Sequence, residues 1–168
     1  RLKERKTNLH SFMMVRNGKI LTEAYYKPFD KDFMHRLYSS SKTYVSIAIG
    51  MLIGEGKIRL EDRISDLMPD LVQIEQHKWM QECTVEDALK MSVPMLTDTY
   101  FALDYKEWAW TFFNHPTRSK ALKPAGTVFD YNTSGSFILD VLVEKITGKP
   151  FLEYMRPVFD KIGVSKDI

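Results

Sequence analysis

The tetrad Ser39-Ser40-Ser41-Lys42 is the part of the sequence whose residue types and spacing could do chemistry. A serine hydroxyl is a poor nucleophile at neutral pH and needs a base beside it. Residues three apart on a helix share a face, so Lys42 can reach the hydroxyl of Ser39, whereas Ser40 and Ser41 point elsewhere. The same tetrad also fits an N-cap serine followed by a solvated lysine. Its setting therefore decides between a nucleophile and a structural cap.

A second candidate is Tyr131, which lies in the Gly- and Pro-containing segment Pro124–Thr133. A tyrosine held near a lysine ammonium could act as a phenolate or as a proton relay. The alternative is a tyrosine that only packs against the core. The sequence by itself leaves both interpretations open.

The elements around the tetrad favour the catalytic interpretation. A hairpin is predicted before it, because the β-forming stretches Ser11–Val15 and Ile20–Tyr26 flank an Asn17-Gly18 turn. A long helix should begin at Ser39 and stop at Gly54, and it is apolar nearly all round. Such a helix is buried, and lysine is rare in buried helices unless it is paired or has a function.

Further helices are predicted along the chain, but little sheet. Thr84 should cap a helix with acids in its first turn. Ser134–Ile146 and Phe151–Ile162 should be helices, the second kinked or broken at Pro157. Only two strands are predicted with any strength, which is too little sheet for a closed α+β domain.

Composition is ordinary for a globular domain and excludes some classes of function. The chain has 168 residues, 44% apolar and 27% charged, with a net charge of +2, so we expect no nucleic-acid partner. No apolar run reaches the roughly 20 residues of a membrane span. The four histidines, His10, His35, His77 and His115, lack a metal-ligand spacing, and we expect neither a metal nor a cofactor. A cytoplasmic and an exported protein fit equally well.

Several sequence blocks occur in the order of a known family. The blocks are His35–Lys42, Gly50–Leu52, Glu55–Asp62, Thr84–Met91 and Pro124–Tyr131, followed by Leu139, Glu144, Thr147-Gly148, Tyr154, Pro157 and Gly163. With them the chain resembles the class C β-lactamase, D,D-peptidase and esterase branch of the penicillin-recognising serine hydrolases, whose signature includes Ser-x-x-Lys. The resemblance implies an α+β, β-lactamase/transpeptidase-like fold.

The resemblance also implies roles for individual residues. Ser39 matches the nucleophile, Lys42 the base and Tyr131 the tyrosine of the second motif. The family often has Tyr-x-Asn there, whereas this chain has Thr133 third and Asn132 in the middle, which favours an esterase or amidase over a β-lactamase. The candidate substrate-binding residues are Thr133, Asn132, Trp108 and Trp110, although core packing suits the two tryptophans as well.

The family's third motif, a Lys-Thr-Gly or His-x-Gly strand that supplies one oxyanion-hole N–H, does not occur before Ile168. We therefore expect residues 1–168 to be the N-terminal part of a serine-hydrolase domain, completed by strands C-terminal to Ile168. The expected function is hydrolysis of an ester, amide or β-lactam through an acyl-enzyme, with a small molecule or peptide as substrate. The alternatives are a penicillin-sensing module that is acylated once and a catalytically idle interaction domain.

Overall fold

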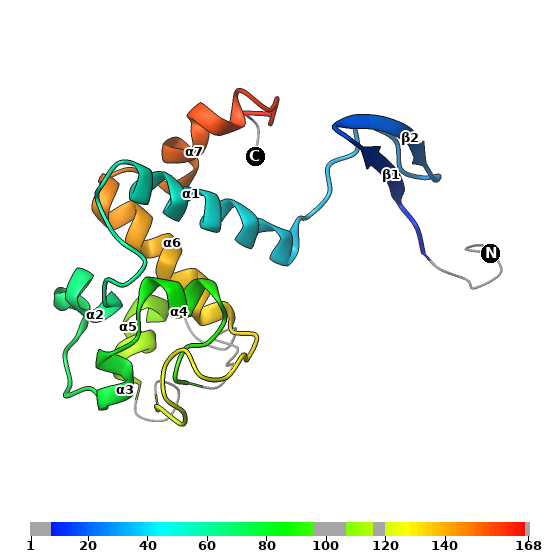
Figure 1. The fold of residues 1–168 in the computed structure, drawn as a ribbon. Helices are drawn as coiled ribbons and strands as arrows, with labels where there is room; N and C mark the ends of the chain where they lie inside the picture. The colour runs from blue at the N-terminus through cyan, green and yellow to red at the C-terminus, as the bar shows by residue number, and fades with distance from the viewer. Residues whose placement is uncertain (1–7, 96–106, 116–119, 167–168) are drawn as a thin grey trace. The chain divides into compact units, whose positions relative to one another are not determined.

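The computed structural model describes residues 8–95, 107–115 and 120–166, in two compact units, 1–38 and 39–168. The first unit contains an antiparallel hairpin of β1 (Ser11–Arg16) and β2 (Lys19–Tyr25) (Figure 1). Asn17 and Gly18 have φ values of 50° and 72°, and two left-handed residues are what a type I′ turn requires. The predicted hairpin is thus confirmed.

Both faces of the hairpin carry exposed apolar side chains. They are Phe12, Met13, Met14, Val15, Ile20, Leu21 and Tyr25. Within the described residues the sheet has only these two strands. A lone two-stranded hairpin is marginal in water, and an apolar surface of this extent is typical of one that another element covers.

The second unit is helical. Its helices are α1 (Lys42–Gly54), α2 (Ile64–Leu67), α3 (Lys78–Gln81), α4 (Val85–Leu89), α5 (Trp108–Asn114), α6 (Thr133–Thr147) and α7 (Phe151–Phe159), with the 3₁₀ turn η2 (Pro69–Leu71). A further 3₁₀ turn, η1 (Tyr38–Ser41), begins at the last residue of the first unit and leads into α1. The central element is α6, which packs against α1, α4, α5 and α7 (Figure 1). The predicted helices at 134–146 and 151–162 are confirmed in outline.

Local sequence explains the length of α6. The Asn132 side chain accepts a hydrogen bond from the Gly135 N–H at 3.0 Å and caps its first turn. Gly148 ends it with a φ of 66°, the left-handed conformation that glycine adopts at little cost. Between these ends, Ile138, Leu139 and neighbouring apolar residues are fully buried in the core.

Two boundaries differ from the sequence prediction. The long helix begins as α-helix at Lys42, not at Ser39, because Tyr38–Ser41 form a tighter 3₁₀ turn. The last helix runs through Pro157 and ends at Phe159, so there is no break at the proline. The proline costs the helix the hydrogen bond that its missing N–H would have made to the Glu153 carbonyl, and the helix ends soon after it, at Phe159.

The start of α4 is held by a reciprocal cap. The backbone N–H of Asp87 donates to Thr84 Oγ1 at 3.2 Å, and Asp87 Oδ2 accepts from the Thr84 N–H at 3.0 Å. The predicted Thr84 cap is confirmed. Just before it, the Cys83 side chain is buried, and burial together with the nearby Asp87 charge raises the pKa of its thiol.

We expect Asp140→Asn to stabilise the protein above pH 7. Burial, and secondly Glu144, raise the pKa of Asp140 from 3.8 to about 6. The folded state then binds this proton more tightly than the unfolded state, so stability from this group is lost as pH rises through that window. Allowing for screening of its exposed part, the variant should gain about 1–2 kcal/mol above pH 7 and little at pH 4.

Denaturant unfolding of both proteins at pH 4 and pH 7.5 measures this difference. The matched control is Glu75→Gln, at an exposed carboxylate, which should change stability by less than about 0.5 kcal/mol. A gain for Asp140→Asn that is equal at the two pH values would contradict the assignment.

Candidate active site

Ser39 and Lys42 meet where the 3₁₀ turn joins α1. Lys42 Nζ donates a hydrogen bond to Ser39 Oγ at 3.0 Å, so the contact expected from their spacing is confirmed. The N-cap of α1 is Ser41, and its side chain makes no capping hydrogen bond. Ser39 is thus not the N-cap residue of α1, and its hydroxyl accepts a hydrogen bond from Lys42. The positive end of the α1 dipole lies beside it and favours a developing negative charge.

Tyr131 completes a group of three side chains. Lys42 Nζ lies 5.1 Å from the centre of the Tyr131 ring. Hydrogen bonding to Ser39, and next to Lys42, lowers the pKa of Tyr131 below its ordinary value of 10.0. A general acid or base works best when its pKa lies near the working pH. The lowered pKa therefore makes the Tyr131 phenol better suited to relay a proton near neutral pH. Tyr131 is 45% exposed and therefore accessible from solvent.

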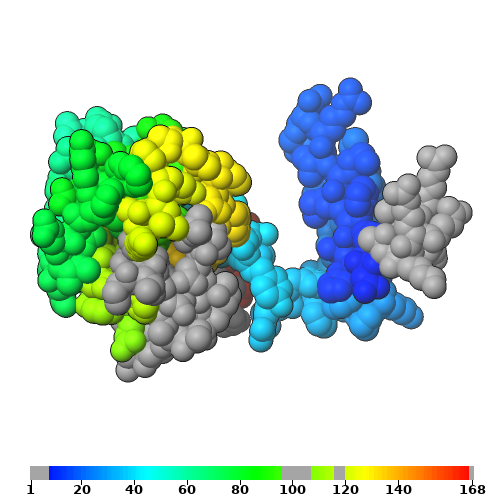
Figure 2. Space-filling view, turned by 90° about the horizontal axis from the view of Figure 1, so that it is seen from below, coloured from blue at the N-terminus to red at the C-terminus, as the bar shows by residue number. Residues whose placement is uncertain are grey.

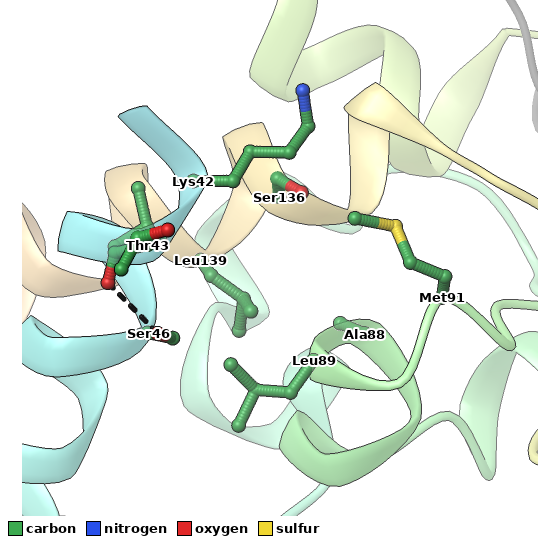
Figure 3. Close-up of a pocket in the computed structure, with 9 residues that line it drawn as sticks. Lys42, Thr43, Ser46, Ala88, Leu89, Met91, Ser136 and Leu139 are labelled. Carbon is green, nitrogen blue, oxygen red and sulfur yellow. Dashed lines mark hydrogen bonds between the residues drawn. The ribbon is translucent and has the colours of Figure 1, made fainter. Parts of the chain in front are cut away.

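A pocket of about 250 Å³ lies between α1, α4 and α6, and Lys42 is one of the residues that line it (Figure 3). Its apolar wall includes Val45, Leu89 and Leu139, and Ser46 and Ser136 add hydroxyls. In Figure 3 the Lys42 side chain runs over this pocket, with its amine directed away from Leu89 and Leu139. The pocket therefore borders the stem of the candidate base rather than its nitrogen.

The loop that carries Tyr131 is docked on the segment after α4. Leu122 and Gly126 donate backbone hydrogen bonds to Pro94 and Ser92 at 3.0 and 2.9 Å. In the space-filling view the yellow loop surface adjoins the green surface of the α3–α4 region (Figure 2). Gly126 has a φ of 74°, and a Cβ there would lie 2.6 Å from Asp87 Oδ1. Glycine is thus required both by the turn and by the close approach.

The candidate substrate-binding residues are not all at this site. Thr133 is half-buried at the start of α6, next to the loop. Asn132 is fully buried, and its side-chain oxygen accepts the hydrogen bond that caps α6. Trp108 packs edge-to-face on Phe137, and Trp110 donates to Gln73 Oε1 at 2.9 Å; neither lines the pocket.

Sequence reasoning missed one residue near the site. Met91 ends the Thr84–Met91 block, and it lines the pocket together with Lys42 and contacts the Tyr131 loop. In the sequence, the position of Met91 could have been recognised because it ends the Thr84–Met91 block and is followed by Ser92 and a proline-containing turn.

Comparison with known proteins places the chain in a family. The model of the Beta-lactamase family matches residues 4–165. The chain belongs to the beta-lactamase family. This beta-lactamase family member superposes on a class C beta lactamase with a TM-score of 0.78 at 16% identity, covering 96% of this chain and 46% of the other. It also superposes on a beta-lactamase/D-alanine carboxypeptidase from Pseudomonas syringae, with a TM-score of 0.72, 19% identity and coverages of 91% and 44%.

A curated relative of this beta-lactamase family member is a putative fimbrial assembly protein, FimD of serogroup D, from Dichelobacter nodosus. The two are 26% identical over 148 residues, which is 83% of this chain and 36% of the relative. The chain therefore spans less than half the length of the proteins it matches. Among the described helices of this family member, none is long and apolar enough to cross a membrane.

Proposed function

We propose that this member of the beta-lactamase family is a serine hydrolase that acts through an acyl-enzyme. Ser39 is the nucleophile, Lys42 the base and Tyr131 the proton relay. The observation that carries the proposal is the 3.0 Å contact between Lys42 Nζ and Ser39 Oγ, with Tyr131 beside both. A nucleophile within hydrogen-bond reach of a base, which is itself oriented by a third group, is the usual signature of covalent catalysis.

In the acylation step Lys42 acts as the general base and accepts the proton of the Ser39 hydroxyl. The Ser39 oxygen attacks the substrate carbonyl and forms a tetrahedral intermediate whose oxygen carries the negative charge. As the bond to the leaving group breaks, Tyr131 donates its proton to that group and is reprotonated by the Lys42 ammonium. Lys42 thereby returns to the protonation state in which it began, and every proton is accounted for.

Hydrolysis of the acyl-enzyme repeats the sequence with water as the nucleophile. Water gives a proton to Lys42 and Tyr131, which act together as the base, and attacks the carbonyl of the acyl-enzyme ester. The Ser39 oxygen leaves and takes that proton back, which restores its hydroxyl. Splitting acyl transfer in this way replaces one hard step with two easier ones. An acyl-enzyme that water does not resolve would instead make the protein a sensor that is acylated once.

For the substrate, we infer an ester or linear amide in preference to a β-lactam. Thr133 stands where the family's second motif often has asparagine, and Asn132 is occupied as a helix cap. A threonine hydroxyl offers one donor in place of the two donors of an amide. It is therefore less suited to hold the side-chain amide of a penicillin.

The proposal is tested by mapping the adduct that a fluorophosphonate or benzylpenicillin leaves on the intact protein. Trypsin cleavage after Arg36 and Lys42 releases a peptide, Leu37–Lys42, that contains three neighbouring serines. Fragmentation of that peptide in the mass spectrometer should place the adduct on Ser39. In parallel, a p-nitrophenyl ester should give more than one product per protein, and faster than the β-lactam.

An adduct on another residue, or no adduct with either reagent, would overturn the proposal. A stable adduct with less than one product per protein would retain Ser39 as nucleophile but identify a sensor. Turnover of benzylpenicillin faster than the ester would contradict the substrate class.

A further inference from the structure

We propose that Met91 is the positioning residue for Tyr131, an inference that rests on the proposed function. The backbone N–H groups on the two sides of Tyr131 both donate to Met91. The Asp130 N–H reaches the Met91 carbonyl oxygen at 2.8 Å, and the Asn132 N–H reaches Met91 Sδ at 3.4 Å. One residue thus brackets the tyrosine from both sides along the chain.

The backbone of Met91 is unusual in a way that fits this role. Its φ is 57°, although it is not glycine, and a residue with a side chain retains this strained conformation only where the surrounding structure imposes it. It lies two residues beyond the end of α4. Reversing the chain there presents the carbonyl and the side chain of the same residue to the incoming loop.

The side chain of Met91 also links the loop to the lysine. In Figure 3 it extends from the segment after α4 toward the first turn of α6, and both Met91 and Lys42 line the pocket. The same methionine therefore borders the stem of the base and holds the backbone of the relay. Displacing it should alter how Tyr131 meets Ser39 and Lys42.

We expect another contact to hold the loop when the sulfur is removed. Lys123 Nζ and Asp130 Oδ2 form an ion pair at 3.1 Å between two partly buried side chains. Substituting the Met91 side chain should therefore shift the tyrosine without releasing the whole loop. The effect of the substitution should therefore appear in the rate of acylation and not only in the free energy of unfolding.

The test compares Met91→Leu with Met91→Gln in the intact protein. Leucine keeps an apolar side chain of similar size but offers no acceptor, whereas the glutamine oxygen can accept the Asn132 N–H. Acylation of Met91→Leu should slow by roughly 10-fold at pH 7, and its pH profile should move to higher pH. The direction follows because hydrogen bonding to Ser39 and Lys42 lowers the Tyr131 pKa, and a displaced tyrosine loses part of that effect.

Met91→Gln should restore most of the rate and the original profile. The matched control is Met80→Leu, the same change in the buried core, which should leave the pH profile in place. In a Tyr131→Phe background, Met91→Leu should no longer shift the profile, because the group being positioned is absent.

An unshifted profile in Met91→Leu, or an equal shift in Met91→Gln, would overturn the role of the sulfur acceptor. A shift that persists in the Tyr131→Phe background would show that Met91 acts through another group. These outcomes require a wild-type protein that is acylated on Ser39. Failure of that labelling would count against the proposed function and not against the positioning role.

Discussion

Replacing Ser39 with alanine should abolish covalent labelling and reduce ester hydrolysis by roughly 10⁴–10⁶-fold. The variant has no oxygen to form the acyl-enzyme, and a water molecule in its place is neither activated nor oriented to the same degree. Labelling is measured by intact mass and hydrolysis by release of p-nitrophenol. The residual rate should come from attack by water on substrate that is bound beside Lys42 and Tyr131.

The fold should be unaffected, so that the loss can be assigned to chemistry. The α1 helix is capped at Ser41 without a side-chain bond, and removal of the exposed Ser39 hydroxyl should change stability by less than about 0.5 kcal/mol. Ser40→Ala is the matched control in the same 3₁₀ turn and should label like wild type. Normal labelling of Ser39→Ala, or loss of labelling in Ser40→Ala, would show that the wrong serine has been assigned.

Replacing Lys42 with methionine should slow acylation by roughly 10²–10⁴-fold, the range that a positioned general base contributes. The methionine fills the space of the lysine stem against the pocket wall, so packing is preserved while the amine is lost. Lys42→Arg should be nearly as impaired. A guanidinium places a permanent positive charge beside Tyr131 and cannot act as a base at accessible pH.

This pair of variants separates proton transfer from charge. Substantial activity in Lys42→Arg together with a dead Lys42→Met would mean that Lys42 acts by its charge, as a clamp on the oxyanion or on the tyrosine. The matched control is Lys90→Met, at an exposed lysine that pairs with Glu86 at 3.3 Å. It should retain full acylation, measured as the rate of adduct formation over the same range of pH.

Features encoded within one or two turns of chain were predictable from sequence. The Asn17-Gly18 hairpin, the Thr84 cap and the Ser39–Lys42 contact each depend on residues at most a few positions apart, and short-range sterics and hydrogen bonding decide them. The α-helix α1 begins at Lys42 and not at the predicted Ser39, because a run of serines is compatible with either a 3₁₀ turn or an α-helix. Only the backbone geometry separates the two.

Features that join distant segments were not predictable in the same way. Nothing in the local sequence says that Met91 contacts Asn132, which lies 41 positions later. The same holds for Asn132 itself: its amide was a candidate for substrate, and the packing of α6 buries it as a cap. Family resemblance indicated which blocks belong together, but the atoms that connect them follow from tertiary packing.

The buried Cys83 makes this chain convenient for fluorescence work. It is the only cysteine of the 168 residues, it is 1% exposed, and burial raises the pKa of its thiol, so little thiolate is available to a maleimide dye. A cysteine introduced by Val128→Cys, at a half-exposed loop position, would be the fast-reacting thiol. A dye attached there would report in real time on the loop that carries Tyr131, without the native cysteine having to be removed first.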